Sequence, residues 1–195
     1  MERVLSADVP FACKCGQVRG AIRGVSHASG DLLCCHCTDC QQFANRFGAE
    51  DRILDANSGT LLYQSGCAAV EVAQGSGNLA CIHLTDKPTL RWYAACCDTP
   101  MFNTYKNARF PYMSTLVANT PQDGREPLMP LRGHIFLSDV PSHEPGLKEL
   151  SMAYFARRFL MRVVRDFYTG ARRRTTLFDS ATLEPIAKPQ RVPPA

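Results

Sequence analysis

The stretch Cys35-His36-Cys37-Thr38-Asp39-Cys40 places three cysteines within six residues. Short Cys-x-Cys and Cys-x-x-Cys spacings let several sulfurs converge on one ion, and zinc prefers thiolate and imidazole ligands arranged as a tetrahedron. The residues from Thr38 to Phe47 predict a short helix, with Thr38 or Asp39 as its N-cap and Gly48 just past its end. The positive end of such a helix stabilises thiolates. We therefore expect Cys35, Cys37 and Cys40 to bind one zinc ion.

Cysteine is abundant along the whole chain, and its positions are clustered. Ten cysteines stand at positions 13, 15, 34, 35, 37, 40, 67, 81, 96 and 97. Disulfides within the clusters would be strained, because thiols one or two residues apart do not reach the usual disulfide geometry. Metal binding is therefore favoured over a disulfide framework. An iron–sulfur cluster, which cysteines also hold, is the main competitor of zinc.

The composition is that of an ordinary soluble globular chain. Of its 195 residues, 45% are hydrophobic and 21% are charged. No run approaches the roughly 20 consecutive apolar residues of a membrane span, and the N-terminal residues lack the apolar segment of a signal peptide. We expect a cytoplasmic protein without a membrane partner.

Residues up to about 140 have the short alternating runs and turn signals of a mainly β protein. Strands are predicted at 17–22, 32–35, 60–64, 68–73, 79–84, 89–95 and 134–137. The segment 120–130 contains three prolines and a glycine, which predicts a loop.

The period changes in the last quarter of the chain. Residues 146–168 contain no proline and are followed by Gly170, which predicts one long helix. Arg158, Arg162 and Arg165 fall on one face of it, and nearly all the rest of the circumference is apolar. We interpret the arginines as a solvated stripe, with ion pairs to an acidic partner or phosphate contacts as alternatives. The apolar surface exceeds one packing face, so we expect a homodimer contact through residues 146–168.

Charge is uneven along the chain. Residues 146–195 carry ten Lys/Arg and four Asp/Glu, a net of +6, against +4 for the whole chain. Residues 171–195 are basic and then proline-rich, and we expect disorder over 185–195. We divide the chain into a zinc-binding β domain at 1–145, a helical extension at 146–170 and a tail at 171–195.

Four elements of the sequence together resemble the glutathione-dependent formaldehyde-activating enzyme family, which has the Mss4-like β fold and includes centromere protein V. The resemblance covers roughly residues 10–140. The four elements are, in order, Cys13-Lys14-Cys15-Gly16-Gln17-Val18-Arg19, Cys35-His36-Cys37-Thr38-Asp39-Cys40, Cys97-Asp98-Thr99-Pro100-Met101-Phe102 and His134-Ile135-Phe136-Leu137. The resemblance implies small zinc-pinned sheets, to which the C-terminal helix is an addition.

The resemblance also implies roles for the cysteines. Cys13, Cys15 and Cys97 match ligands of the family's structural zinc, and Cys35, Cys37 and Cys40 match the zinc site at which the family is thought to bind glutathione. The family's third element usually has a cysteine where this chain has Ala94. Cys96 would replace that ligand only if a local turn brought it beside Cys97, since adjacent side chains in an extended chain point apart.

The implied activity is that of a carbon–sulfur lyase, which makes or breaks the hydroxymethyl adduct of a glutathione-like thiol. After Cys40 the family usually has a basic residue and a Ser-Gly-like pair, whereas this chain has Gln41 to Asn45. The alternative is a non-catalytic zinc-stabilised module whose basic C-terminal region binds an anionic or protein partner. We do not expect nucleic acid as the partner.

The remaining cysteines and histidines have plainer interpretations. Cys67 and Cys81 stand alone in apolar runs and are expected to be buried, inert thiols. Strand alternation turns Cys34 away from Cys35, which makes a role as a ligand or an accessory thiol its less favoured interpretation. We interpret His36 as a hydrogen-bonded residue behind the metal or a surface residue, which we favour over a ligand role. His134 has either a strand-packing role or a chemical one.

Overall fold

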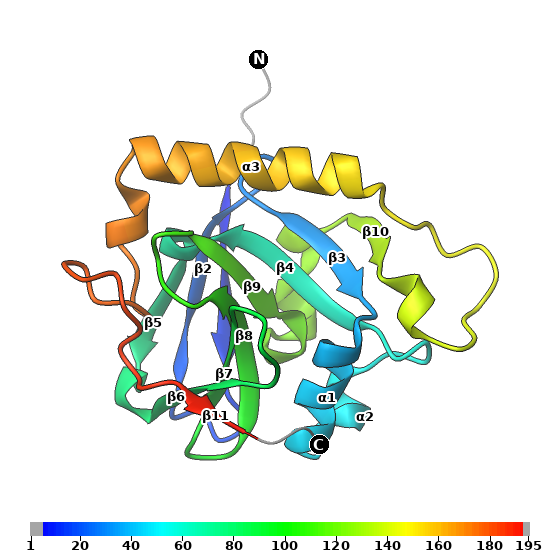
Figure 1. The fold of residues 1–195 in the computed structure, drawn as a ribbon, viewed down its shortest axis with the longest axis horizontal. Helices are drawn as coiled ribbons and strands as arrows, with labels where there is room; N and C mark the ends of the chain where they lie inside the picture. The colour runs from blue at the N-terminus through cyan, green and yellow to red at the C-terminus, as the bar shows by residue number, and fades with distance from the viewer. Residues whose placement is uncertain (1–5, 193–195) are drawn as a thin grey trace.

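Figure 1 shows the computed structural model, which describes residues 6–192. Its framework is two β-sheets, in agreement with the mainly β prediction. The smaller sheet is antiparallel and has the order β1 (Ala7–Ala12), β2 (Arg19–Val25), β5 (Val70–Gln74). The fold class predicted from the sequence is therefore confirmed.

The larger sheet has eight strands, and Cys34, Cys35 and Cys81 lie in them. Its order is β10 (Leu131–Ile135), β3 (Asp31–Cys35), β4 (Thr60–Gly66), β9 (Tyr112–Leu116), β8 (Thr99–Tyr105), β7 (Thr89–Ala94), β6 (Leu79–His83), β11 (Gln190–Arg191). Only β10 with β3 and β11 with β6 pair in parallel within the described residues. The parallel pairing of β10 aligns its histidine with a cysteine of β3.

Side chains on the two faces of the larger sheet pack into two separate hydrophobic cores. Leu32, Trp92 and Phe102 face the smaller sheet in the larger core, where Phe11 meets Phe102 edge to face at 5.2 Å. On the opposite face, neighbours such as Leu33 pack against the helices α1 (Thr38–Arg46) and α2 (Glu50–Ile53). Along the chain, α1 begins at Thr38, shortly after β3 ends at Cys35.

Four strands and one helix escaped the sequence analysis, namely β1, β8, β9, β11 and α2. β8 and β9 place polar residues such as Asn103, Thr104 and Ser114 in buried positions, so they lack the apolar–polar alternation that predicts a strand. Helix α2 is only four residues long. The segment 120–130 has no strand, as predicted, and contains the 3₁₀ turns Gln122–Gly124 and Glu126–Leu128.

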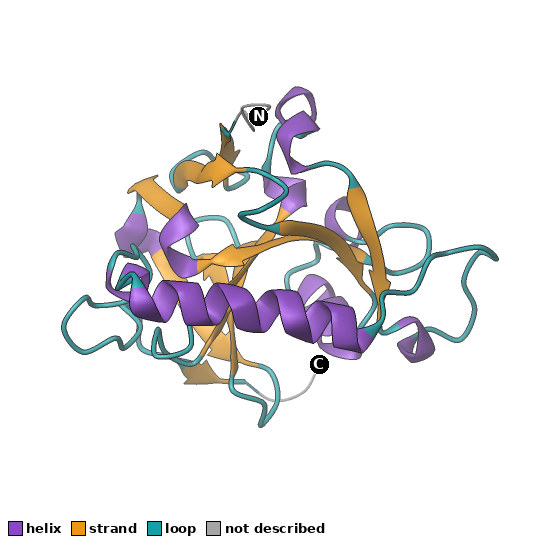
Figure 2. Cartoon of the chain, turned by 90° about the horizontal axis from the view of Figure 1, so that it is seen from above, coloured by secondary structure: helices purple, strands orange, loops and turns teal. Residues whose placement is uncertain are grey.

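The long helix α3 (Met152–Tyr168) lies across the ends of several strands, as Figures 1 and 2 show from two sides. It ends where predicted, and Gly170 follows with a left-handed φ of 65°. It begins later than the predicted residue 146. The backbone of His134 accepts a hydrogen bond from Leu150 and donates one to Lys148, both at 2.8 Å. These bonds hold residues 148–150 extended beside β10, so the helix starts after them.

Arg158 and Arg162 point inward to Asp31, which corrects the solvated-stripe interpretation for two of its three arginines, whereas the Arg165 side chain is 51% exposed. Arg162 is 6% exposed and pairs with Asp31, whereas Leu160 and Met161 are 59% and 61% exposed. The physical reason is the buried carboxylate of Asp31 at the start of β3, which Arg158 and Arg162 both neutralise. The helix is therefore anchored through charge. Phe155 and Phe159 pack toward the sheet, whereas other apolar residues such as Leu160 and Met161 face solvent.

The C-terminal segment is ordered, contrary to the predicted disorder over 185–192. Leu177, Phe178 and Leu183 lie in the larger core, with Phe178 against Trp92 at 5.9 Å. β11 then extends the larger sheet beside β6. The burial of these apolar side chains holds the proline-rich stretch against the sheet. Composition alone does not indicate this burial. Residues 193–195 lie outside the described residues, and the division into domains stays a prediction.

Candidate metal centres

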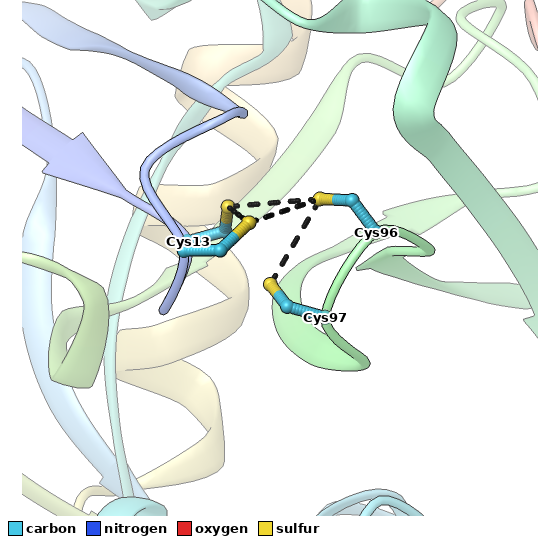
Figure 3. A group of neighbouring side chains, drawn as sticks. Cys13, Cys96 and Cys97 are labelled. Atoms are coloured by element: carbon cyan, nitrogen blue, oxygen red, sulfur yellow. Dashed lines mark hydrogen bonds between the residues drawn. The ribbon is translucent and has the colours of Figure 1, made fainter.

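Four cysteines from two segments far apart in the sequence, Cys13, Cys15, Cys96 and Cys97, lie close together. Figure 3 labels three of them, Cys13, Cys96 and Cys97. Cys13 and Cys15 follow β1, and Cys96 and Cys97 lie in the turn between β7 and β8. The measured Sγ–Sγ distances are 3.6 Å for Cys13 to Cys15, 3.9 Å for Cys13 to Cys96, 3.4 Å for Cys15 to Cys96 and 3.9 Å for Cys96 to Cys97. We call these four residues the first sulfur cluster.

Cys96 lies in a local turn of the kind that it needs in order to replace the ligand missing at position 94. Residues 95–98 form a hydrogen-bonded turn, in which the amide of Cys97 bonds to the carbonyl of Ala94 at 3.2 Å and Asp98 has a positive φ of 52°. Both adjacent thiols consequently face Cys13. Ala94, where the family usually has a cysteine, is fully buried in the larger core.

The spacing of this cluster suits a tetrahedral ion. Four sulfurs at about 2.3 Å from zinc lie about 3.8 Å from one another, close to the distances in the cluster. Burial opposes ionisation of Cys97, but hydrogen bonds from the Thr99 hydroxyl and from Cys15 outweigh it and lower the pKa of the Cys97 thiol to about 6. The cluster could hold a metal ion.

The second group is the predicted one, Cys35, Cys37 and Cys40, which we call the trio. Cys35 ends β3, Cys37 is the N-cap of α1, and Cys40 lies in its first turn. The Sγ atom of Cys35 lies 3.4 Å from that of Cys37 and 3.7 Å from that of Cys40. Neither Thr38 nor Asp39 caps the helix, because Cys37 has the extended backbone of that position. The trio could hold a metal ion through three sulfurs.

A buried arginine sets the electrostatics of the trio. Arg91 on β7 donates from Nη1 to the Sγ of Cys40 at 3.3 Å, and its Nη2 lies 3.7 Å from Asp39. Hydrogen bonds with Cys35 and Cys37, and then the Arg91 guanidinium, lower the pKa of the Cys40 thiol well below its usual value. Burial alone would lower the pKa of Arg91, but the Cys40 and Cys37 thiolates raise it. Cys40 is therefore prepared to be a thiolate.

A cavity of about 520 Å³ opens beside the trio. Its walls include all three cysteines, Arg91, and aromatic residues from the sheet and from α3, namely Tyr105, Phe110, Tyr112, Phe155 and Phe159. Lys87, whose side chain is 63% exposed, stands at the rim and pairs with Asp39 at 3.0 Å. Another cavity of about 650 Å³ lies over β1 and β2, and no cysteine or histidine is among its described lining residues. The chemistry therefore concentrates at the trio's cavity.

A third group was missed by the sequence analysis. Cys34, His36 and His134 bring their donor atoms within 4.8 Å of one another, and all three are buried. We call them the mixed cluster. His36 is hydrogen-bonded as expected but is 0% exposed, which excludes the surface alternative. The alternation Cys34-x-His36 could have indicated this group, because it places both residues on the face opposite Cys35 and Cys37. Their partner on β10, His134, is brought to them only by the fold.

The isolated thiols behave as predicted. Cys67 and Cys81 are buried in the larger core, and burial raises the pKa of each, to about 12 for Cys81. Their Sγ atoms donate only to the backbone carbonyls of Tyr112 and Ala187 among the hydrogen bonds found in residues 6–192. They are structural side chains.

One protein-family model matches most of the chain. The model of a family of unknown function (DUF6151) matches residues 5–181. The chain belongs to this family. The match includes every cysteine of the three clusters and the whole of α3.

Other comparisons add little to that assignment. No curated protein matches the chain. One matching solved structure is the crystal structure of a Rhodobacter sphaeroides protein from a structural genomics programme, with 16% sequence identity and a TM-score of 0.42. The match covers 63% of this chain and 96% of the other. No helix within residues 6–192 is long and apolar enough to cross a membrane.

Proposed function

We propose that this protein is a zinc-dependent enzyme of thiol adduct chemistry, similar to a carbon–sulfur lyase. The observation that carries the proposal is the convergence of the three sulfurs of the trio on the wall of a cavity of about 520 Å³. Catalytic zinc sites typically combine three protein ligands with one open position. The first sulfur cluster, with four sulfurs, has the number of ligands of a closed structural site.

The reaction proposed is the reversible addition of a thiol to an aldehyde. The sulfur forms a bond to the carbonyl carbon, the carbonyl π electrons move to oxygen, and the thiol proton ends on that oxygen. The reverse breaks the carbon–sulfur bond and returns the proton to sulfur. A zinc ion held by the trio would supply the Lewis acidity that keeps a thiol ionised near neutral pH.

Arg91 supports this chemistry by balancing charge. Three thiolates exceed the charge of Zn²⁺ by one, and an unbalanced charge in a buried site is costly. The guanidinium of Arg91, 5% exposed and 3.3 Å from the Sγ of Cys40, provides the compensating positive charge. The same hydrogen bond would reduce the reactivity of Cys40 itself, so that an incoming thiol is the better nucleophile.

Tyr112 and Ser114 offer the proton donor that the adduct oxygen needs. Their hydroxyls lie 2.8 Å apart in the wall of the same cavity. Burial raises the pKa of Tyr112 to about 12, so the phenol stays protonated and can donate a hydrogen bond to the aldehyde oxygen. The cation of Lys87 at the rim suits a thiol that carries a carboxylate, of which glutathione is one.

The alternative binding module would rely on basic residues of the C-terminal region. Arg158 and Arg162 are engaged with Asp31 inside the molecule. Two of the cations that this alternative needs are thus committed to the fold, which favours the enzyme.

Calorimetry with glutathione tests the proposal. Binding should release a proton, because a thiol held by the metal is deprotonated, so the measured heat should differ between two buffers of different ionisation enthalpy. Cys37→Ser should abolish the heat, since it removes one of the three sulfurs that would hold the metal, and serine preserves the size of this partly buried side chain. Cys81→Ser, at an isolated thiol, is the matched control and should bind normally. Absence of heat with glutathione and with other small thiols, despite full zinc occupancy, would contradict the proposal.

A further inference from the structure

We propose that Cys34, His36, His134 and Asp55 form a third metal site, which takes a zinc-like divalent cation. This site is independent of the proposed thiol chemistry, because it lies on the opposite face of β3 from Cys35. It belongs to neither sulfur cluster and would use one sulfur, two imidazoles and one carboxylate.

Strand register brings the first three ligands together. His134 of β10 is the direct pairing partner of Cys34 of β3 in a parallel ladder, so their side chains stand next to each other on one face. His36 follows Cys34 by two residues and lies near the same position, with its amide bonded to the carbonyl of Ile135 at 3.0 Å. The cluster therefore follows from the β3–β10 pairing and not from a chance approach of flexible side chains.

The tautomer of His36 leaves a donor lone pair aimed into the cluster. Its Nδ1 lies 2.9 Å from the backbone carbonyl oxygen of Asn57. Because a carbonyl only accepts, Nδ1 carries the proton and Nε2 has the lone pair. That Nε2 atom is 2.9 Å from Nδ1 of His134. A histidine whose second nitrogen donates to a backbone carbonyl is the usual arrangement of a metal ligand.

Asp55 is held so that one oxygen remains for a metal. Its Oδ1 accepts hydrogen bonds from the amides of Asn57 at 2.9 Å and Gly59 at 2.7 Å. Its Oδ2 lies 3.3 Å from the Sγ of Cys34. The two amides fix the carboxylate in the turn that leads into β4. Cys34, His36 and His134 already have their donor atoms within 4.8 Å of one another, and Oδ2 of Asp55, beside the Sγ of Cys34, is the fourth donor that we propose.

Gly59 shows how closely that turn approaches the cluster. A Cβ atom at this position would lie 2.4 Å from the Sγ of Cys34 and 2.6 Å from Cε1 of His36, both impossible contacts. The backbone of the turn therefore packs directly on the ligands, and only glycine permits it. Such a closed arrangement is typical of a structural site and not of one that admits a substrate.

Charge balance explains why such polar groups are buried together. The exposed fractions of Cys34, His36 and His134 are 2%, 0% and 9%. Asp55, in contrast, is exposed and lies at the solvent side of the site. A divalent cation with one thiolate, one carboxylate and two neutral imidazoles has zero net charge, so the three buried ligands can surround it without an unpaired charge. The ion would join β3, β10 and the 55–59 turn next to the strand end that carries Cys35.

The stoichiometry of bound metal tests the proposal in the full-length chain. After saturation with Zn²⁺ alone and removal of excess ion, we expect three zinc ions per chain in the wild type and two in His134→Ala. His83→Ala, a histidine of β6 outside the cluster, is the matched control and should retain three. Two ions in the wild type, or three in His134→Ala, would overturn the proposal.

Titration of the wild type with Co²⁺ removes any dependence on the folding of a variant. The site has one sulfur, so its equivalent should add about a third of the thiolate-to-cobalt absorbance that the three sulfurs of the trio add. Asp55→Asn, which preserves the size of the side chain, should weaken that equivalent. In Cys37→Ser the one-sulfur equivalent should persist, which separates this site from the proposed function. A titration that ends without a one-sulfur equivalent would overturn the third site.

Discussion

Asp31, the first residue of β3, and Arg162, in the middle of α3, form a buried ion pair with Nη1 to Oδ2 at 2.5 Å. Both side chains are 7% exposed. Arg158 donates to the same carboxylate at 2.9 Å, and Arg162 also donates to the amide oxygen of Gln64 at 2.7 Å. The long helix is thus attached to the strand that leads, four residues later, to Cys35.

Breaking this pair should destabilise the fold strongly. Arg162→Ala leaves a largely buried carboxylate short of a partner, and removing one member of a buried pair costs about 3 kcal/mol or more. Arg23→Ala is the matched control, because Arg23 pairs with Asp8 and Glu71 on the surface, where such pairs contribute about 0–1 kcal/mol. Urea unfolding gives both free energies. Equal losses in the two variants would contradict the anchoring role.

The same pair predicts how stability depends on pH. Burial alone would raise the pKa of the Asp31 carboxyl, but hydrogen bonds from Arg158 and Arg162 outweigh it and hold the pKa below its ordinary value of 3.8. A carboxyl whose pKa is lower in the folded state stabilises the fold above its unfolded pKa. That contribution is lost as the pH falls through the folded pKa.

Unfolding measured between about pH 6 and about pH 2 tests this dependence. We expect the free energy of unfolding of Asp31→Asn to fall less steeply with acidification than that of the wild type. Other carboxyls titrate equally in both proteins, so the difference isolates Asp31. Identical slopes would show that Asp31 does not contribute.

Cys96 should prove essential to the first sulfur cluster. Its Sγ lies within 3.9 Å of those of Cys13, Cys15 and Cys97, so Cys96→Ser should lower zinc content and melting temperature together, because binding energy of a structural site is folding energy. Cys81→Ser is the control, since its thiol contacts only a carbonyl at 3.4 Å among its recorded hydrogen bonds in residues 6–192. Unchanged metal content in Cys96→Ser would mean a site without this ligand.

The metal in the sulfur clusters is predicted to be zinc. Elemental analysis should find zinc without iron, and the protein should be colourless, because Zn²⁺ has a filled d shell. A brown protein containing iron and labile sulfide would show an iron–sulfur centre instead.

The outward face of α3 leads us to propose a homodimer. Leu160, Met161, Val164 and Phe167 are each at least 45% exposed, and a contiguous apolar surface of this kind is typical of an interaction site. Light scattering should show a dimer of the wild type, and Met161→Glu should produce monomers without unfolding. Met129→Glu, at another exposed methionine, should leave the dimer intact. A wild-type monomer across a wide concentration range would contradict the proposal.

The local spacing of residues was enough to predict several features. Cys35, Cys37 and Cys40 are so near in sequence that a strand end followed by a helix brings their sulfurs together in almost any surrounding fold. The mainly β class followed from alternation in strands that are half buried. β8 and β9 escaped because strands buried on both faces carry no alternation.

Only tertiary structure decided the relationships between distant residues. The sequence alone indicated an arginine stripe on the helix, but whether it faces water or the protein depended on Asp31, more than a hundred residues away. The same holds for Cys34 and His36, whose partner His134 arrives by the parallel pairing of β10. The physical reason is that periodicity reports which residues share a face, whereas the charge and donor atoms opposite that face are supplied by strands elsewhere in the chain.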